Sequence, residues 1–227
     1  MNKQQFERTI NLIGEDAFNK IISKKVMVLG IGGVGGFVCE ALARVGVNNF
    51  VLIDNDVVSV SNLNRQIIAL NSTLGMKKVD VMKQRILDIN SKAQVEALCQ
   101  FVTPEYLKKL NYNVDYVIDC IDNVTAKIEL AVLSQEKGFK LVSCMGTGNK
   151  LYPELFEITD IYKTSVCPLA KVMRKELKAR GVQKLQVLYS KEEPIKTNKR
   201  IPASISFTPS IAGLRIAEFV IKKFIEE

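Results

Sequence analysis

Histidine is absent from the 227 residues of this sequence. Its absence excludes every mechanism that depends on a histidine general base, which is the commonest base at neutral pH. Activation of a carboxylate is still allowed, because a carboxylate is ionised at neutral pH and is already a nucleophile. The composition therefore favours chemistry that works by positioning reactants and stabilising charge.

Paired cysteines are also absent. The chain has no Cys-x-x-Cys motif, which excludes a structural zinc site of that spacing. Five cysteines, scattered singly, indicate a reducing compartment, and we expect a cytoplasmic protein. Without a histidine partner, Cys167 is not expected to act as a nucleophile. The other four are expected to be packing residues: Cys39, Cys99, Cys120 and Cys144.

Long hydrophobic runs are missing as well. The most apolar stretch, 211–225, is short and is interrupted by four charged residues. It is typical of an amphipathic closing helix, and no segment is long and apolar enough to cross a membrane. The polar opening residues 1–5 do not resemble a signal peptide.

Glycines, by contrast, are concentrated directly after an apolar run. Residues 26–29 have the length and composition of a buried strand, and a helix is expected over 36–45. Between them stand Gly30, Gly32, Gly33 and Gly35. Such a loop lets the backbone approach a ligand closely, and the following helix offers its N–H groups to a phosphate. The pattern predicts a nucleotide site.

Charged and polar residues after the next strand indicate which nucleotide binds. Asp54 follows the apolar run 50–53, at about the spacing of a ribose-binding acid, roughly 20 residues on. Asp56, Arg65 and Lys78 come soon after. An arginine and a lysine can neutralise a triphosphate, and a second acid offers an oxygen ligand to Mg²⁺. This set favours ATP cleavage over the chemistry of NAD.

The wider pattern alternates strands and helices. Strands are expected near 26–29, 50–54, 94–102, 114–119 and 139–145, and helices near 36–45, 75–89, 104–110, 125–137, 168–180 and 210–225. This predicts an α/β fold with a Rossmann-like, mostly parallel sheet and helices on both faces. We expect a single domain over 1–227, with a basic C-terminal insertion and a closing helix.

Positive charge is concentrated in residues 163–200. This segment holds eleven Lys or Arg and three Glu, an excess of +8, which equals the net charge of the whole chain. Such an excess is either a solvated face or the binding surface for a polyanion such as RNA. Few aromatic residues accompany it, so contacts to phosphates are expected. The candidate contacts are Lys163, Lys171, Arg174, Lys175 and Lys178.

Several separated motifs resemble the ubiquitin-activating-enzyme-like adenylyltransferases, which activate a carboxylate as an acyl-adenylate. The resemblance is carried by 26–66, by Lys78 and by Asp119-Cys120-Ile121-Asp122-Asn123. It implies that the four glycines form the phosphate loop and that Asp54 holds the ribose. It further implies that Asn62, Arg65 and Lys78 contact phosphates and that Asp122 holds Mg²⁺. Arg65, Lys78 and Asp122 would be the catalytic residues.

The later motifs resemble one branch of that superfamily, the tRNA threonylcarbamoyladenosine dehydratases. They are 146–150, 160–164, 167–174 and 204–213, so that the similarity covers nearly the whole chain. This branch uses ATP to activate the threonyl carboxylate of a modified adenosine beside the anticodon, and ring closure follows. The chain departs from it at Cys167-Pro168-Leu169, where many members carry Asp-Pro-Leu, so any role of that Asp is not transferable.

The resemblance also implies a homodimer in which Arg8 reaches the partner's site, and leaves open an unidentified sulphur-transfer or redox partner.

Two other functions are considered. Activation of a sulphur-carrier or ubiquitin-like protein would use the same ATP site, but the missing zinc cysteines and the basic segment oppose it. A non-catalytic RNA-binding nucleotide sensor is the second alternative. It is opposed by the combination of Asn62, Arg65, Lys78 and Asp122, which is more than nucleotide binding alone requires.

Overall fold

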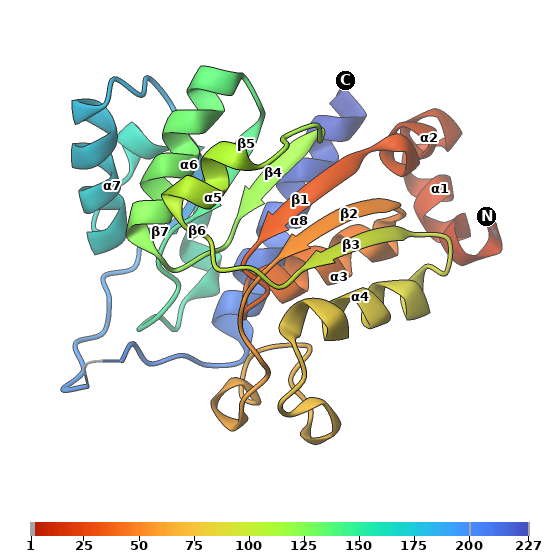
Figure 1. Cartoon of the computed structure of the whole chain (residues 1–227), viewed down its shortest axis with the longest axis horizontal. Helices are drawn as coiled ribbons and strands as arrows, with labels where there is room; N and C mark the ends of the chain where they lie inside the picture. The colour runs from red at the N-terminus through yellow and green to blue at the C-terminus, as the bar shows by residue number, and fades with distance from the viewer. Residues whose placement is uncertain (1–2, 200, 227) are drawn as a thin grey trace.

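The computed structural model describes residues 3–199 and 201–226, so Arg200 of the basic segment lies outside the described residues. Its centre is a seven-stranded sheet in the order β3-β2-β1-β4-β5-β7-β6. All neighbours are parallel except β6, which pairs antiparallel with β7 (Figure 1). The strands are β1 (Lys25–Leu29), β2 (Asn49–Ile53), β3 (Gln94–Leu98), β4 (Tyr116–Asp119), β5 (Leu141–Cys144), β6 (Phe156–Asp160) and β7 (Gln186–Ser190).

Helices cover both faces of this sheet. The helices are α1 (Glu7–Ile13), α2 (Glu15–Ser23), α3 (Gly35–Val45), α4 (Lys78–Ile89), α5 (Pro104–Lys109), α6 (Val124–Lys137), α7 (Pro168–Ala179) and α8 (Phe207–Glu226). Alternate residues of β1 belong to different apolar clusters. Val26 and Val28 pack with α3, α4 and α8, whereas Met27 and Leu29 pack with α6 and α7. The predicted mostly parallel, doubly covered sheet is confirmed.

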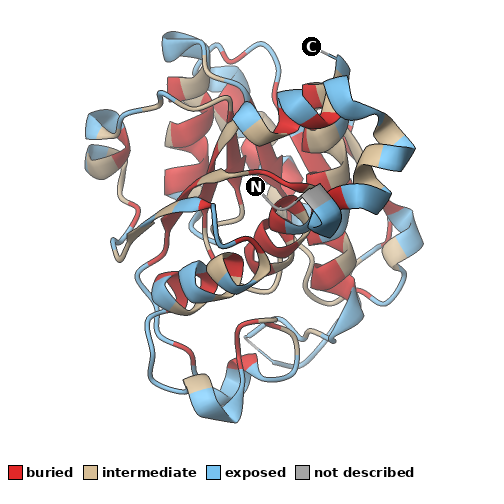
Figure 2. Cartoon of the chain, turned by 90° about the vertical axis from the view of Figure 1, so that its right-hand side faces the viewer, coloured by how far each residue is buried: buried red, intermediate tan, exposed pale blue. Residues whose placement is uncertain are grey.

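The core is almost continuous across the central strands. All four residues of β4 and of β5 are buried, as are the last four of β1 and β2. Figure 2 shows the buried strands between helices whose outer faces are exposed. Strands buried on both faces read as apolar runs rather than alternating patterns, which is why the sequence revealed them.

Some predicted boundaries were wrong. The strand expected over 94–102 ends at Leu98, and the helix expected from 75 begins at Lys78. Residues 75–77 instead pair with the preceding loop: the Gly75 N–H donates to the Val58 carbonyl oxygen at 2.9 Å, and Lys77 bridges to Val57. Helices α1 and α2 and strands β6 and β7 were not predicted at all.

The strand order places the candidate residues together, beyond the carboxyl ends of the central strands. From β1 the chain moves to β2 and β3 on one side, then returns to β4 and β5 on the other. Ligands of open α/β sheets bind where the order reverses, beyond the carboxyl ends of the strands. Here that point lies between β1 and β4. The glycine loop follows β1, Asp54 follows β2 and Asp122 follows β4.

Candidate nucleotide-binding site

The glycine loop crosses the end of β4 at a distance that only glycine permits. Gly30 has a φ of +87°, and a Cβ atom there would lie 2.6 Å from the Cys120 carbonyl oxygen. A Cβ atom on Gly35 would lie 1.8 Å from the Gly30 carbonyl oxygen. The loop is therefore folded tightly against β4, and it delivers the first turn of α3 to the switch point.

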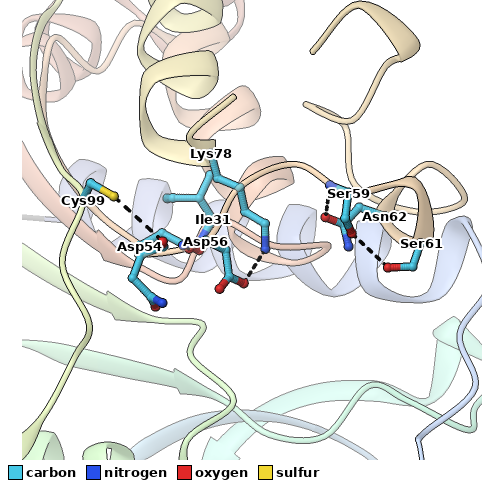
Figure 3. A network of polar contacts seen from close by, with 9 residues as sticks. Ile31, Asp54, Asp56, Ser59, Ser61, Asn62, Lys78 and Cys99 are labelled. Atoms are coloured by element: carbon cyan, nitrogen blue, oxygen red, sulfur yellow. Dashed lines mark hydrogen bonds and ion pairs between the residues drawn. The ribbon is translucent and has the colours of Figure 1, made fainter. Parts of the chain in front are cut away.

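Asp54 fixes this loop to the end of β2. Its Oδ2 accepts a hydrogen bond from the Ile31 N–H at 2.6 Å, and its Oδ1 accepts one from the Asp56 N–H at 2.8 Å (Figure 3). Burial raises the pKa of the Asp54 carboxyl, against the effect of these two hydrogen bonds. Each oxygen keeps a further lone pair, so the side chain can also accept a ribose hydroxyl.

Lys78 is held in place by an ion pair with Asp56. Its Nζ lies 2.7 Å from Asp56 Oδ2, and the lysine side chain is 6% exposed while that of Asp56 is 59% exposed. Figure 3 shows the two side chains meeting beside Asp54. Cys99 was expected to be a packing residue, and it is half-buried against the apolar cluster that contains Val26 and Val28. Its Sγ lies 3.8 Å from the Asn55 carbonyl oxygen at the border of this network.

Asn62 and Arg65 lie on the turn that follows. Asn62 is buried, and its Oδ1 accepts a hydrogen bond from the Ser59 N–H at 3.1 Å, so it shapes the turn. Arg65 Nη1 donates to the Ser61 carbonyl oxygen and to Asn64 Oδ1, both at 2.8 Å. The arginine stem lies against the glycine loop, 3.5 Å from where a Cβ on Gly33 would stand. Arg65 thus lies beside the glycine loop, and its expected contact with phosphates stays a prediction.

Asp122 is a candidate ligand for a divalent cation. Its carboxylate is exposed, and no described residue forms a hydrogen bond or ion pair with it. The described residues contain no cluster of three metal-ligating side chains. A lone carboxylate fits Mg²⁺, which proteins commonly hold by one or two carboxylates together with phosphate oxygens and water.

Arg8 lies away from these residues. It is exposed on α1. That helix lies toward the amino ends of the strands, away from the carboxyl ends that the glycine loop follows (Figure 1). The preceding segment contacts the end of α4, where Gln5 donates a hydrogen bond to the Ile89 carbonyl oxygen. The structure of one chain therefore does not bring Arg8 to the glycine loop.

A buried polar cluster beside the site escaped prediction. Lys127 Nζ lies 2.9 Å from Asp119 Oδ2, both side chains are almost inaccessible, and Ser143 donates to the same carboxylate. Asp119 Oδ1 accepts a hydrogen bond from the Ile121 N–H at 3.1 Å. The cluster joins β4, β5 and α6 and fixes the start of the loop that carries Asp122. The sequence offered one signal for this cluster: Asp119 ends an apolar run, and Lys127 follows it eight residues later.

The basic segment comprises α7, β7 and the loops next to them. Lys163, Lys171, Lys175 and Lys178 are exposed, whereas Arg174 is half-buried and its Nη1 donates to the Thr164 carbonyl oxygen at 3.0 Å. Arg174 therefore anchors the start of α7. Cys167, immediately before α7, is 2% exposed, which supports a packing role.

Glu192 does not offset the surface charge of this segment. It is buried, and its carboxylate accepts the N–H groups of Leu151 and Tyr152. No helix in the described part of the chain is long and apolar enough to span a membrane.

Comparisons with known proteins agree on one family. A model of the ThiF family matches residues 6–227. The chain is 40% identical over 242 residues to the tRNA threonylcarbamoyladenosine dehydratase of Bacillus subtilis (strain 168), covering 98% of this chain and 95% of that protein. It is 33% identical to the sulfur carrier protein ThiS adenylyltransferase of Escherichia coli (strain K12), over 66% of this chain and 63% of that protein.

A solved structure gives the same result. The crystal structure of the E. coli tRNA N6-threonylcarbamoyladenosine dehydratase in complex with ATP superposes with a TM-score of 0.93 at 33% identity. The match covers 99% of this chain and 95% of that one. The same E. coli protein in complex with AMP matches equally well.

The Asp54 contacts give a first prediction. Asp54→Ala leaves the Ile31 and Asp56 N–H groups without their acceptor, and leaving the buried Ile31 N–H unpaired costs about 1–3 kcal/mol. The free energy of unfolding in urea should therefore fall by at least that amount, and nucleotide binding should be lost. The control is Asp88→Ala, an exposed site where the change should stay within about 0.5 kcal/mol. Equal stability of the two variants would contradict the role given to Asp54.

Proposed function

Because the chain belongs to the ThiF family, we propose that it is an ATP-dependent tRNA threonylcarbamoyladenosine dehydratase that acts as one ATP-binding domain over residues 1–227. The observation that carries the proposal is the match to these dehydratases along nearly the full length of both chains. The similarity to a sulfur carrier adenylyltransferase covers only 66% of the chain. The comparisons thus favour a tRNA substrate over a carrier protein, and an enzyme over a sensor.

The reaction proceeds in two steps. A carboxylate oxygen of the threonyl group attacks the α-phosphorus of ATP, and pyrophosphate leaves. A nucleophile within the same modified nucleoside then attacks the activated carbonyl, loses its proton and expels AMP. The carboxylate oxygen departs on AMP, so that the substrate loses the elements of water overall. Neither step needs a histidine or an enzyme thioester.

The residues of the site suit the first step. The glycine loop and the start of α3 bind phosphate through backbone N–H groups. Asp54 holds the ribose, while Arg65 and Lys78 neutralise the charge that develops on the phosphates. Asn62 is placed to contact a phosphate through its amide. Since Lys78 is paired with Asp56 beforehand, its ammonium is already ordered when the nucleotide arrives.

Asp122 is the residue that would hold Mg²⁺, and Asp56, which pairs with Lys78, is a second exposed carboxylate of the candidate site. When bound, the ion would neutralise phosphate charge and favour departure of pyrophosphate. The Asp122 carboxylate is exposed and has no partner among the described residues, which supports this assignment.

Loss of a charged phosphate contact gives the test of the reaction. A hydrogen bond to a charged group is worth about 1.5–3 kcal/mol, so Arg65→Ala should lower AMP release with modified tRNA by roughly 10- to 100-fold. Asp122→Ala should lower it as well and should raise the Mg²⁺ requirement. The exposed control Lys83→Ala should keep the wild-type rate. Near-wild-type rates in both site variants would rule out the proposed roles of Arg65 and Asp122. Pyrophosphate exchange that depends on a carrier protein instead of tRNA would favour activation of a sulphur-carrier or ubiquitin-like protein.

The exposed face of α7 is the proposed tRNA surface. Lys171, Lys175 and Lys178 recur at helical spacing and lie on neighbouring parts of one face. Lys163 adds a fourth exposed cation just before the helix. Arg174 contributes mainly by fixing the loop that precedes the helix, and its remaining N–H groups can still face a phosphate. Because the chain outside residues 163–200 carries no net charge, the basic segment attracts a polyanion selectively.

Charge reversal of the three exposed lysines tests this surface. Each phosphate contact contributes a slope of about −0.7 to −0.9 in log K against log salt, so Lys171→Glu, Lys175→Glu and Lys178→Glu together should flatten the slope by roughly 2–3. The Kd for tRNA should rise, and the ATP affinity should stay unchanged. Filter-binding titrations across salt concentrations measure both.

A variant of equal net charge is the control for that experiment. Reversal of Lys83, Lys92 and Lys109, all exposed on other elements, should change tRNA binding far less. Equal effects of the two triple variants would mean that only overall charge matters, and that α7 is a solvated face.

We further propose a homodimer in which Arg8 completes the partner's site. Exposed apolar side chains gather on the loops between β2 and α4, among them Val57, Val60, Leu70 and Met76. Patches of this kind mark protein interfaces, and a second copy would cover them. A cavity of about 770 Å³ beside them is lined by Gln5, close to Arg8 in the sequence.

Complementation tests whether Arg8 acts across the dimer. Mixing Arg8→Ala with Lys78→Ala protein should restore part of the activity, because one of the two hybrid sites is then intact. Mixing Arg65→Ala with Lys78→Ala should restore none, since both changes damage the site of their own chain. No recovery in the first mixture, despite proven subunit exchange, would show that Arg8 does not act across the interface.

The cellular setting belongs to the proposal as well. All five cysteines are free in the described structure, which suits a reducing, cytoplasmic environment. A sulphur-transfer or redox partner stays a hypothesis, because no described surface residue points to its chemistry.

A further inference from the structure

A strap of chain joins β7 to α8 beside the glycine loop. It comprises residues 194–199 and 201–206 of the described structure, and most of its side chains are exposed. Figure 1 shows the chain passing from β7 to the start of α8 near the loops that follow β2. Directly after the strap, Pro209 packs against the glycine loop, since its Cβ lies 3.2 Å from where a Cβ atom on Gly33 would stand. The strap therefore ends beside the loop expected to bind phosphate.

Asn149, in the loop after β5, holds the two stretches of the strap. Its carbonyl oxygen accepts the Ile195 N–H at 2.8 Å. Its own N–H donates to the Ala203 carbonyl oxygen at 2.8 Å, and its Oδ1 accepts the Ala203 N–H at 2.7 Å. The φ of Asn149 is +58°, a left-handed conformation that asparagine tolerates better than most residues. One residue in an uncommon conformation thus fixes the strap at two points.

Two further contacts place the strap across the switch point of the sheet. A Cβ atom on Gly148 would lie 2.8 Å from Pro202 Cβ, so glycine lets the strap lie close to the loop after β5. On the other side, Asn64 Nδ2 donates to the Ser204 carbonyl oxygen at 3.1 Å. The strap is thus tied both to the loop after β5 and to the turn that carries Arg65. Since β1 and β4 lie between β2 and β5, it borders the carboxyl ends where the candidate site lies.

The exposed side chains of the strap suit RNA. Lys196 and Lys199 are exposed cations, and no Asp or Glu occurs from 194 to 217. Ile201 is 80% exposed, and Phe207, the first residue after the strap, is also exposed. In unpaired RNA, phosphates pair with cations while the faces of the bases pack on apolar and aromatic side chains. The absence of acids favours such a polyanion over a protein partner as the occupant of this surface.

We propose that the strap binds the unpaired RNA next to the target nucleoside, and that Asn149 is the positioning residue that holds the strap at the edge of the site. The proposal rests on the proposed function in that the substrate is an RNA. Helix α7 has a different place, because it packs with α6 on the face of the sheet opposite α8. The strap therefore contacts RNA beside the reacting carboxylate, and a short anticodon stem-loop should need it as much as whole tRNA does.

Protection from trypsin tests the contact directly on the unaltered protein. An anticodon stem-loop that carries threonylcarbamoyladenosine should slow cleavage after Lys196 and Lys199 in proportion to the fraction of protein bound. Cleavage after the exposed Lys92, in the turn that follows α4, should not change. Bound stem-loop that leaves cleavage of the strap unchanged would overturn the proposal and favour a protein partner for its apolar side chains. A protein that binds neither the stem-loop nor tRNA would instead contradict the proposed function.

Charge reversal measures what the strap contributes to affinity. Lys196→Glu together with Lys199→Glu should raise the Kd for the stem-loop at least about tenfold and flatten its salt dependence by roughly 1.5 in log K against log salt. The ATP affinity should stay unchanged. The matched control, Lys83→Glu with Lys92→Glu, alters net charge equally at exposed positions outside the strap. Equal effects of the two double variants would overturn the proposal.

Two variants of Asn149 test its positioning role. Asn149→Gly still allows a positive φ but removes the acceptor of the Ala203 N–H, so the KM for modified tRNA should rise about three- to tenfold at unchanged ATP affinity. Asn149→Asp keeps an acceptor oxygen and should restore most of kcat/KM. The role of Asn149 is overturned if Asn149→Gly has the wild-type KM, if its ATP affinity falls equally, or if Asn149→Asp is no better than Asn149→Gly.

Discussion

The close crossing of the glycine loop and the end of β4 is the constraint on which the rest of the site depends. Gly30 and Gly35 permit the crossing, and Asp54 holds it through the N–H groups of Ile31 and Asp56. Once the loop is fixed, α3 begins at the switch point of the sheet and Arg65 packs beside Gly33. The phosphate site therefore follows from backbone geometry, and the charged side chains are arranged around it.

This arrangement requires that several charged side chains be buried near the strand ends. Asp54 is an acid whose pKa burial raises, and Lys78 is a nearly buried lysine that depends on one ion pair with Asp56. Asp119 and Lys127 are buried completely, and each is tolerable only because the other is present. These pairs order the loops that follow β2 and β4 before any ligand arrives. A site whose charges are already placed loses little free energy to reorganisation during the reaction.

The sequence allowed the central part of this structure to be predicted, because its signals are local. Glycines after an apolar run, and an acid after the next one, identified the loop and Asp54. The pairing of Lys78 with Asp56 joins residues 22 positions apart and leaves no pattern in one sequence, whereas the pairing of Lys127 with Asp119 left only the weak signal of a lysine eight residues after an acid. Strand β7 was missed because its apolar core, Val187 to Tyr189, lies within a basic segment.

The central claim is that this site activates the carboxylate of a modified tRNA nucleoside. Mass analysis of nucleosides digested from tRNA, after incubation with the protein, ATP and Mg²⁺, tests it most directly. The account predicts that threonylcarbamoyladenosine disappears and that a product lighter by one water molecule accumulates, with AMP and pyrophosphate released in equal amounts. Unchanged threonylcarbamoyladenosine in the presence of a protein that binds ATP would contradict it.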